Sequence, residues 1–513
     1  MQALKPEDAR LIHSEAPRAH GNVSLIHIYD QSTVPGGTLR FKTVLAHIES
    51  RLGRSPVFRR KLQRAPLGLG PAYWIDDENF DLEYHVRHIA LPKPGDWRQF
   101  CIQLARLHAR PLDLDRPLWE IYVVEGLDAF TDLPAGSFAL LTKTHHVAID
   151  SDDCGELTGL LHDVTSDVGA PAPPEPWFPR RAPPPVALLR RGLMRAVGSP
   201  LRMAVPLARA IGQVAPAALA WVREALRPAT GFPETRFNAA VSPHRVFETR
   251  RFALEEFETV RRLVPGATVD DVVLAVCAGA LRRYLQRHDE LPTDSLTAFA
   301  PACLSSQAGD SACQPHERGW MPLRLATEVA DPVQRLRAIC AQTTAAGAEQ
   351  RALGARQTSD TAKRMPAATL SVASKWLGRA GHMAGRSAPL ASCAIANVPG
   401  PAVPMYLCGA RLSYFSAMLP ISDGLGLVFA VTCYDGRLVV SPTSCRELMP
   451  DPALFALDLR ESFQELWALA QPTVKTPTKI KVKTEVQPLP PPSKPRRRSA
   501  SSSDKSGRAA RSV

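Results

Sequence analysis

The sequence lacks the short motifs that mark several common kinds of enzyme site. It contains no HExxH pair for zinc, no GxSxG turn for a nucleophilic serine and no GxxxxGK loop for phosphate. Its ten cysteines form no CxxC pair, and their spacing predicts neither a zinc site nor a disulfide framework. The segment Gly68–Tyr73 lacks the third glycine of a dinucleotide loop. These absences count against the metal, hydrolase and nucleotide-binding sites that are easiest to find in a sequence.

Long apolar runs are also missing. No run of eighteen apolar residues occurs, so the sequence predicts no membrane-spanning helix. The N-terminal stretch MQALKPEDARLIHSEA has no apolar signal region. Together with the unpatterned cysteines, this start predicts a protein of a reducing, cytoplasmic compartment.

The net charge of +12 suggests nucleic-acid binding until the charge is located along the chain. Residues 472–513 hold eleven Lys and Arg against two acids, a net of +9, which leaves only +3 for the first 471 residues. This tail is rich in Pro, Lys, Arg and Ser, so it is predicted to be disordered. A solvated basic tail is the simpler interpretation, and we expect no specific nucleic-acid partner.

The chain's 513 residues predict more than one domain of ordinary size. Short strand-like and helix-like segments alternate over residues 1 to about 165. The prolines of Ala170–Pro185 cannot continue a helix or a central strand and predict a linker. We therefore predict an N-terminal domain over 1–169, a linker with a basic segment over 170–240, a C-terminal domain over 241–471, and the tail.

Several elements are marked by their apolar spacing or by their turns. Two strands, two helices and one hairpin around Asp435-Gly436 are expected. Their predicted ranges are Val23–Asp30 and Phe138–His146 for the strands, Trp97–Leu112 and Asp270–Gln286 for the helices, and Leu425–Thr443 for the hairpin.

The most distinctive local pattern is THHVAIDSDD, which places His145, His146 and Asp150 after a strand-like run. A histidine pair followed four residues later by an aspartate can bind a metal, can supply a general base with a supporting carboxylate, or can belong to an ordinary polar loop. The metal alternative is the weakest, because no further His or Cys cluster supplies the remaining ligands. The local pattern alone leaves these alternatives open.

The chain resembles the bacterial wax ester synthase/diacylglycerol acyltransferase family, within the coenzyme A-dependent acyltransferase superfamily marked by HHxxxDG. That motif stands here as HHVAIDS, His145 to Ser151. Other matching segments follow the family's order over about 460 residues. They are LKPEDARLIHSE (4–15), FRRKL (58–62), YWIDDENFDLEYHVRHIALPKPG (73–95), LARLHARPLDLDRPLWEIYVVEGL (104–127), TVDDVVLAVCAGALRRYL (268–285) and NVPGP (397–401).

The resemblance implies an α/β fold with two chloramphenicol acetyltransferase-like domains, each with a mixed sheet and flanking helices, and an active site between them. It implies that His146 is the general base for attack of a lipid hydroxyl on an acyl-CoA thioester, a task suited to imidazole. His145 would support it, and Asp150 would hold the loop through an ion pair. Diacylglycerol or a long-chain alcohol would be the acceptor, and no metal or cofactor beyond the acyl-CoA substrate is implied.

Three positions depart from the family pattern. The motif's glycine is Ser151, the ND element is Asp270-Asp271, and the PVSxR stretch is PACLS without its arginine. Ser151, Asp270 and Asn397 of NVPGP are further candidates for contacting substrate or shaping the site, although Asp270 also suits a helix start. The departures favour an alternative function, a catalytically degenerate lipid-binding or lipid-body protein, whereas the intact His146 and Asp150 favour an enzyme.

The segment Val186–Arg227 is basic and apolar and has no acid before Glu224. Its arginines at 195, 202, 209 and 223 recur near one helical face, which suits an interfacial helix beside anionic headgroups. A linker helix packed on the domains is the alternative. We expect a peripheral protein of the inner membrane or of lipid bodies.

Overall fold

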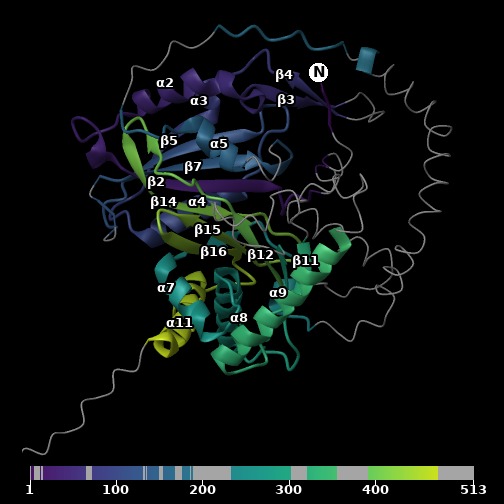
Figure 1. Cartoon of the computed structure of the whole chain (residues 1–513). Coiled ribbons are helices and arrows are strands. Elements are labelled where there is room, and N and C mark those ends of the chain that lie inside the picture. Colours follow the sequence, from purple (N-terminus) through teal and green to yellow (C-terminus); the bar gives the residue numbers. More distant parts are fainter. Residues whose placement is uncertain are drawn as a thin grey trace, which may run out of the picture. The chain divides into compact units, whose positions relative to one another are not determined.

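The computed structural model describes residues 2–4, 8, 12, 15–64, 72–130, 133–134, 136–148, 154–167, 176–184, 186–188, 233–301, 320–354 and 391–471. The described elements form two mixed sheets, with helices packed on them, and a small third sheet (Figure 1). This arrangement confirms the predicted α/β fold class. None of the described helices combines the length with the apolar composition that spanning a bilayer requires.

The first sheet carries the histidine pair at the end of one of its central strands. Its strands are, in order, β13 (Tyr406–Leu407), β14 (Ala410–Met418), β2 (Asn22–Asp30), β7 (Phe138–His145), β6 (Trp119–Glu125) and β5 (Val86–Ala90). Only β5 and β6 pair in parallel, and the other neighbours are antiparallel. The observed β2 and β7 confirm the two strands predicted near Val23–Asp30 and Phe138–His146.

Helices cover both faces of the first sheet. They are α2 (Phe41–Arg51), α3 (Leu82–His85), α4 (Trp97–Ala109) and α5 (Cys154–Leu161). Along β2, Ile26 and Ile28 belong to the apolar cluster built on α4, whereas Leu25 and Tyr29 belong to the cluster that includes α2. This alternation is the two-residue period of a strand that is buried on both faces.

The second sheet has its helices gathered on one side (Figure 1). Its strands are, in order, β11 (Trp320–Arg324), β10 (Thr297–Pro301), β12 (Cys393–Val398), β15 (Val428–Tyr434), β16 (Arg437–Cys445) and β8 (Arg245–Phe247), with β9 (Arg250–Ala253) also paired to β16. The helices are α7 (Leu254–Val260), α8 (Val269–Arg287), α9 (Pro332–Gly354) and α11 (Pro452–Ala470). The third sheet contains β1 (Gln2–Ala3), β4 (Tyr73–Asp76) and β3 (Arg60–Gln63).

Strand β14 links the two halves of the chain. It begins 380 positions after the end of β2 in the sequence, yet Ser416 pairs with Ile26 in the first sheet. Side chains of β15 then bond to the β14 backbone, with Thr432 Oγ1 donating to Phe415 O at 3.0 Å and the Tyr434 hydroxyl to Leu412 O at 3.1 Å. The C-terminal half therefore completes the sheet that carries the histidines. The predicted domain boundaries stay a prediction.

Local sequence signals explain where several of these elements begin or turn. Helix α8 starts in a capping box in which Thr268 Oγ1 accepts from Asp271 N, while the Asp271 carboxylate accepts from Thr268 N. Strands β15 and β16 join through Asp435 and Gly436, whose φ angles of 48° and 68° fit a tight hairpin turn. The predicted helix and hairpin are both confirmed. Trp119 is 1% exposed and donates its Nε1–H to Phe58 O, as expected for a core residue.

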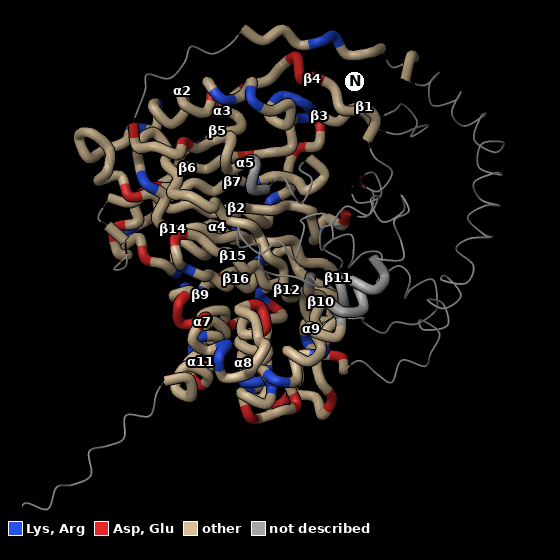
Figure 2. Tube along the Cα trace, in the orientation of Figure 1, with Lys and Arg blue, Asp and Glu red and all other residues tan. Residues whose placement is uncertain are grey.

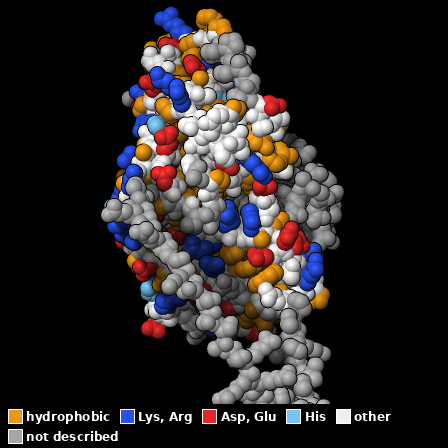
Figure 3. All heavy atoms as spheres, turned by 90° about the vertical axis from the view of Figure 1, so that its left-hand side faces the viewer, with side chains coloured by type: hydrophobic (Ala, Val, Ile, Leu, Met, Phe, Trp, Pro, Cys, Tyr) orange, Lys and Arg blue, Asp and Glu red, His pale blue; other side chains and the backbone are white. Residues whose placement is uncertain are grey.

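Charges of both signs are interspersed over the described elements, as Figure 2 shows along the chain and Figure 3 shows on one face of the surface. This pattern agrees with the small net charge of the first 471 residues. The predicted disordered tail over 472–513 and most of the predicted interfacial segment, residues 189–227, lie outside the described residues.

Candidate active site

The end of β7 and the start of β2 lie side by side, and this pairing creates the site. The two strands are antiparallel, with Asn22 opposite His145. Past the end of β7, His146 N donates to Gly21 O at 3.0 Å, so the second histidine is held against the residue before β2. His145 N donates to Leu118 O at 2.9 Å on the other side. Both histidines are buried, at 1% and 5% exposed.

The ring of His146 is oriented by the same residue that holds its backbone. Its Nδ1–H donates to Gly21 O at 2.9 Å, because a carbonyl oxygen can only accept. A proton fixed on Nδ1 makes Nε2 the basic nitrogen of the neutral ring. The arrangement therefore presents one defined nitrogen for proton transfer.

Gly21 must be a glycine for this contact to exist. A Cβ built on it would lie 2.3 Å from His146 Nδ1 and 2.9 Å from Glu15 Oε1. Both distances are shorter than any ordinary contact, so the imidazole lies in the space that a side chain at position 21 would fill.

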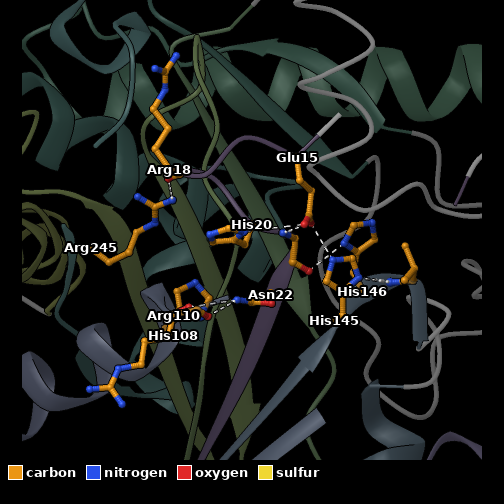
Figure 4. A network of polar contacts seen from close by, with 11 residues as sticks. Glu15, Arg18, His20, Asn22, His108, Arg110, His145, His146 and Arg245 are labelled. Atoms are coloured by element: carbon orange, nitrogen blue, oxygen red, sulfur yellow. Dashed lines mark hydrogen bonds and ion pairs between the residues drawn. The ribbon is translucent and has the colours of Figure 1, made fainter. Parts of the chain in front are cut away.

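Glu15 ties the second side of the site together. Its Oε1 accepts from His145 Nε2 at 2.7 Å and from Gly21 N at 2.6 Å (Figure 4). Burial alone would raise the pKa of the Glu15 carboxyl, but hydrogen bonds from His145 and His20 hold that pKa well below its ordinary value. Glu15 is therefore an anion that accepts hydrogen bonds from His145 and from Gly21 N. Gly21 in turn accepts the hydrogen bond that orients the His146 ring.

No pattern in the sequence marks Glu15 or Gly21 as a site residue. Glu15 lies 130 positions before His145, within a segment noted only for its family resemblance. The predicted supporting carboxylate was Asp150, which lies with Ser151 outside the described residues. Their predicted roles stay predictions, and Glu15 is the carboxylate that the structure places on the histidine pair.

The other candidates belong to the second sheet and its helices. Asn397 is on β12, in register with Val431 of β15. Asp270 is in the first turn of α8, beside Asp271, which is 2% exposed and accepts from Thr343 Oγ1 of α9 at 2.6 Å. The acidic pair thus starts α8, in agreement with the interpretation of these acids as helix-start residues, and Asp271 also ties α8 to α9.

A buried polar layer lies beneath the histidines on the α4 face of the first sheet. Lys143 is fully buried, two residues before His145. Its Nζ donates to Glu120 Oε2 at 3.3 Å, and the same oxygen accepts from the Tyr122 hydroxyl at 2.8 Å. Burial lowers the pKa of the Lys143 ammonium, and Glu120 opposes that shift. These satisfied charges stiffen the strand that presents the site.

The comparisons with known proteins identify the family. Residues 4–273 match the model of the wax ester synthase/diacylglycerol acyltransferase catalytic domain, and residues 317–467 match the WS/DGAT C-terminal domain. The chain belongs to the wax ester synthase/diacylglycerol acyltransferase family. It is thus an acyltransferase, as predicted.

Individual relatives agree with this assignment. A Mycobacterium tuberculosis (strain CDC 1551 / Oshkosh) protein named as a candidate diacylglycerol O-acyltransferase is 30% identical over 476 residues, covering 91% of this chain and 90% of the relative. The wax ester synthase/diacylglycerol acyltransferase of Marinobacter aquaeolei VT8 superposes with a TM-score of 0.66 at 24% identity, covering 92% and 100% of the two chains. The starter condensation domain of rhizomide synthetase shares the fold at a TM-score of 0.51 and 13% identity, with 91% and 94% covered. These likenesses confirm the chloramphenicol acetyltransferase-like fold.

An expected result follows for Glu15. Glu15→Ala should slow acyl transfer by about tenfold to a hundredfold, because it removes charge-assisted hydrogen bonds that hold both His145 and Gly21. Glu15→Gln keeps one carbonyl oxygen for those two bonds but loses the charge and the second carboxylate oxygen, so it should be the milder change. Initial rates of ester formation measure both variants.

Glu15→Gln should also change how the melting temperature depends on pH. The folded-state pKa of Glu15 is depressed, so its ionised carboxylate stabilises the protein at pH values above the unfolded-state pKa of 4.5. This contribution is lost progressively as the pH falls below 4.5 toward the folded-state pKa. The melting temperature of the wild type should exceed that of Glu15→Gln at neutral pH, and the gap should narrow in acid. A gap that stays constant from pH 7 to pH 3 would contradict the assigned charge.

Proposed function

We propose that the protein transfers a fatty acyl group from acyl-CoA to the hydroxyl of diacylglycerol or of a long-chain alcohol, with His146 Nε2 as the general base. The observation that carries the proposal is the Nδ1–H bond from His146 to Gly21 O, which leaves Nε2 as the proton acceptor. The family's name and those of its relatives support the acyl-CoA donor and the lipid acceptors.

The reaction is a direct displacement. His146 Nε2 takes the hydroxyl proton while the acceptor oxygen attacks the thioester carbonyl carbon, giving a tetrahedral oxyanion and an imidazolium. Collapse re-forms the carbonyl and breaks the C–S bond, and the leaving thiolate takes the proton from Nε2. The ester and free CoA leave, and the neutral ring is restored. No covalent acyl-enzyme, metal or cofactor enters this scheme.

Each neighbour of His146 has a part in that cycle. Gly21 O keeps the ring in one orientation while Nε2 gains and loses its proton, and it accepts from Nδ1 in both states. Glu15 places a negative charge near the ring pair, which favours the transient imidazolium over the neutral form. His145 bridges Glu15 and the loop, since its Nδ1 accepts from Val147 N at 3.3 Å. The intact arrangement supports catalysis over the alternative of a degenerate lipid-binding protein.

Purified protein mixed with radiolabelled palmitoyl-CoA should form labelled ester when either hexadecanol or dioleoylglycerol is present. Thin-layer chromatography of the products, with thiol release followed in parallel, measures the transfer and shows which acceptor is preferred. Thiol release without labelled ester would mean thioester hydrolysis and would reject transfer to these acceptors. The predicted attachment to the inner membrane or to lipid bodies, where such acceptors reside, is part of the same proposal.

A further inference from the structure

A basic cleft lies between the third sheet and the predicted linker. It has a volume of about 680 Å³ and is lined by four arginines and one acid, Asp76, together with two aromatic residues. The arginines are Arg59, Arg60, Arg180 and Arg181, and the aromatic residues are Trp177 and Phe178. This volume lies within the usual range of small-molecule sites.

The linker segment is fixed in place as one wall of the cleft. Arg180 N donates to Asp76 Oδ2 at 3.1 Å, and Ala182 N donates to Glu78 Oε1 at 2.9 Å. The guanidinium of Arg59 lies 4.9 Å from the centre of the Trp177 ring. In Figure 1 the segment 176–184 passes beside the three-stranded sheet. The prolines predicted a linker, and its described residues 176–184 are hydrogen-bonded to the N-terminal half.

Two arginines of this wall, Arg180 and Arg181, are open to a ligand. The side chains of Arg180 and Arg181 are exposed, and among the described residues no carboxylate forms a salt bridge with either. The carboxylate of Asp76 has other partners, because its Oδ2 accepts the hydrogen bond from Arg180 N and its Oδ1 lies 3.8 Å from Arg60 Nε. Phe178 is 83% exposed, so its ring is open to contact with a bound ligand.

Arginines in pairs beside aromatic rings match one chemical class of ligand. Guanidinium groups bind phosphate oxygens through paired hydrogen bonds, and aromatic faces stack on nucleobases. A purely lipidic phosphate would use the arginines alone, whereas a phosphorylated nucleoside uses both features and fills a concave site.

The cleft is joined to the catalytic loop by a short series of contacts. Phe58, next to the lining residue Arg59, accepts a hydrogen bond from Trp119 Nε1 at 3.0 Å. Leu118, the residue before Trp119, accepts from His145 N at 2.9 Å. Val147, the residue after His146, lies in the same apolar cluster as Leu62 of β3. The wall of the cleft and His146 therefore belong to one packed unit, although they occupy different positions in it.

We propose that this cleft binds the phosphorylated adenosine end of the acyl-CoA donor, and the proposal rests on the function proposed above. In acyl-CoA the pantetheine arm separates the thioester from the nucleotide, so a nucleotide site is required away from His146. Arg180 and Arg181 bind the phosphates, and Trp177 or Phe178 packs against the adenine.

The test compares two donors in the Arg180→Gln/Arg181→Gln double variant. Palmitoyl-CoA carries the nucleotide, whereas palmitoyl-N-acetylcysteamine lacks it. We expect KM for palmitoyl-CoA to rise about tenfold or more, with kcat for that donor and kcat/KM for the short donor unchanged. The matched control is Arg337→Gln/Arg460→Gln, which removes two exposed arginines from α9 and α11 and should leave both donors unaffected.

Each other outcome overturns the proposal. An unchanged KM for palmitoyl-CoA would show that the two arginines do not bind the donor. An equal loss of kcat/KM with both donors would indicate a structural role. In a parallel titration, adenosine 3′,5′-bisphosphate should bind the wild type and bind the double variant at least tenfold more weakly. Binding of phosphatidate-containing vesicles by the wild type, without binding of the bisphosphate, would assign the cleft to lipid headgroups instead. If the wild type used neither donor, the proposed function would fail, and the bisphosphate titration would still decide the cleft.

Discussion

Gly21→Ala is expected to slow acyl transfer by about a hundredfold, because misplacing a reacting group by about 1 Å costs that much. The new methyl group would lie 2.3 Å from His146 Nδ1 and 2.5 Å from Cε1, so the ring must move by roughly that amount to reach an ordinary contact. The change displaces the ring and Glu15 but removes neither of these groups from the site. Initial rates of ester formation measure it.

Gly159→Ala is the matched control for that substitution. Gly159 lies in α5, and a Cβ built on it meets nothing within 4 Å in the described structure. Alanine there should leave activity intact and raise stability slightly, since alanine suits a helix better than glycine. Native rates in a folded Gly21→Ala protein would contradict the placement of the imidazole against Gly21.

The sequence predicted those features that local spacing encodes. The strand that ends at His145 follows from its run of branched and apolar residues, and α8 follows from its apolar spacing and acidic first turn. The turn at Asp435-Gly436 follows from residues that tolerate positive φ. Each of these features depends on neighbours within a few positions, so one sequence is enough to find it.

Features that depend on distant segments were not predictable from one sequence. Glu15 meets His145 only because β2 pairs with β7, and no local pattern states which strands will pair. The insertion of β14 into the first sheet could not be predicted either, since it pairs residues almost 400 positions apart in the sequence. The family resemblance identified His146, but the atoms that orient its ring became visible only in the fold.

His146→Ala should have the largest effect of any single substitution. It removes the nitrogen that takes the hydroxyl proton, and general base catalysis contributes about a hundredfold to ten-thousandfold. The ring's bond to Gly21 O is lost as well, at a cost of about 1 kcal/mol in the free energy of unfolding. His145→Ala should cost less activity, because His145 acts through Glu15 and the loop.

The most direct test of the account is the initial rate of labelled ester formation from palmitoyl-CoA, measured for the wild type and for His146→Ala at equal concentrations of folded protein. Circular dichroism and the melting temperature establish that both are folded. The account predicts a fall of about a hundredfold or more in His146→Ala. A folded His146→Ala protein that makes ester at close to the wild-type rate would contradict the assignment of His146 as the base.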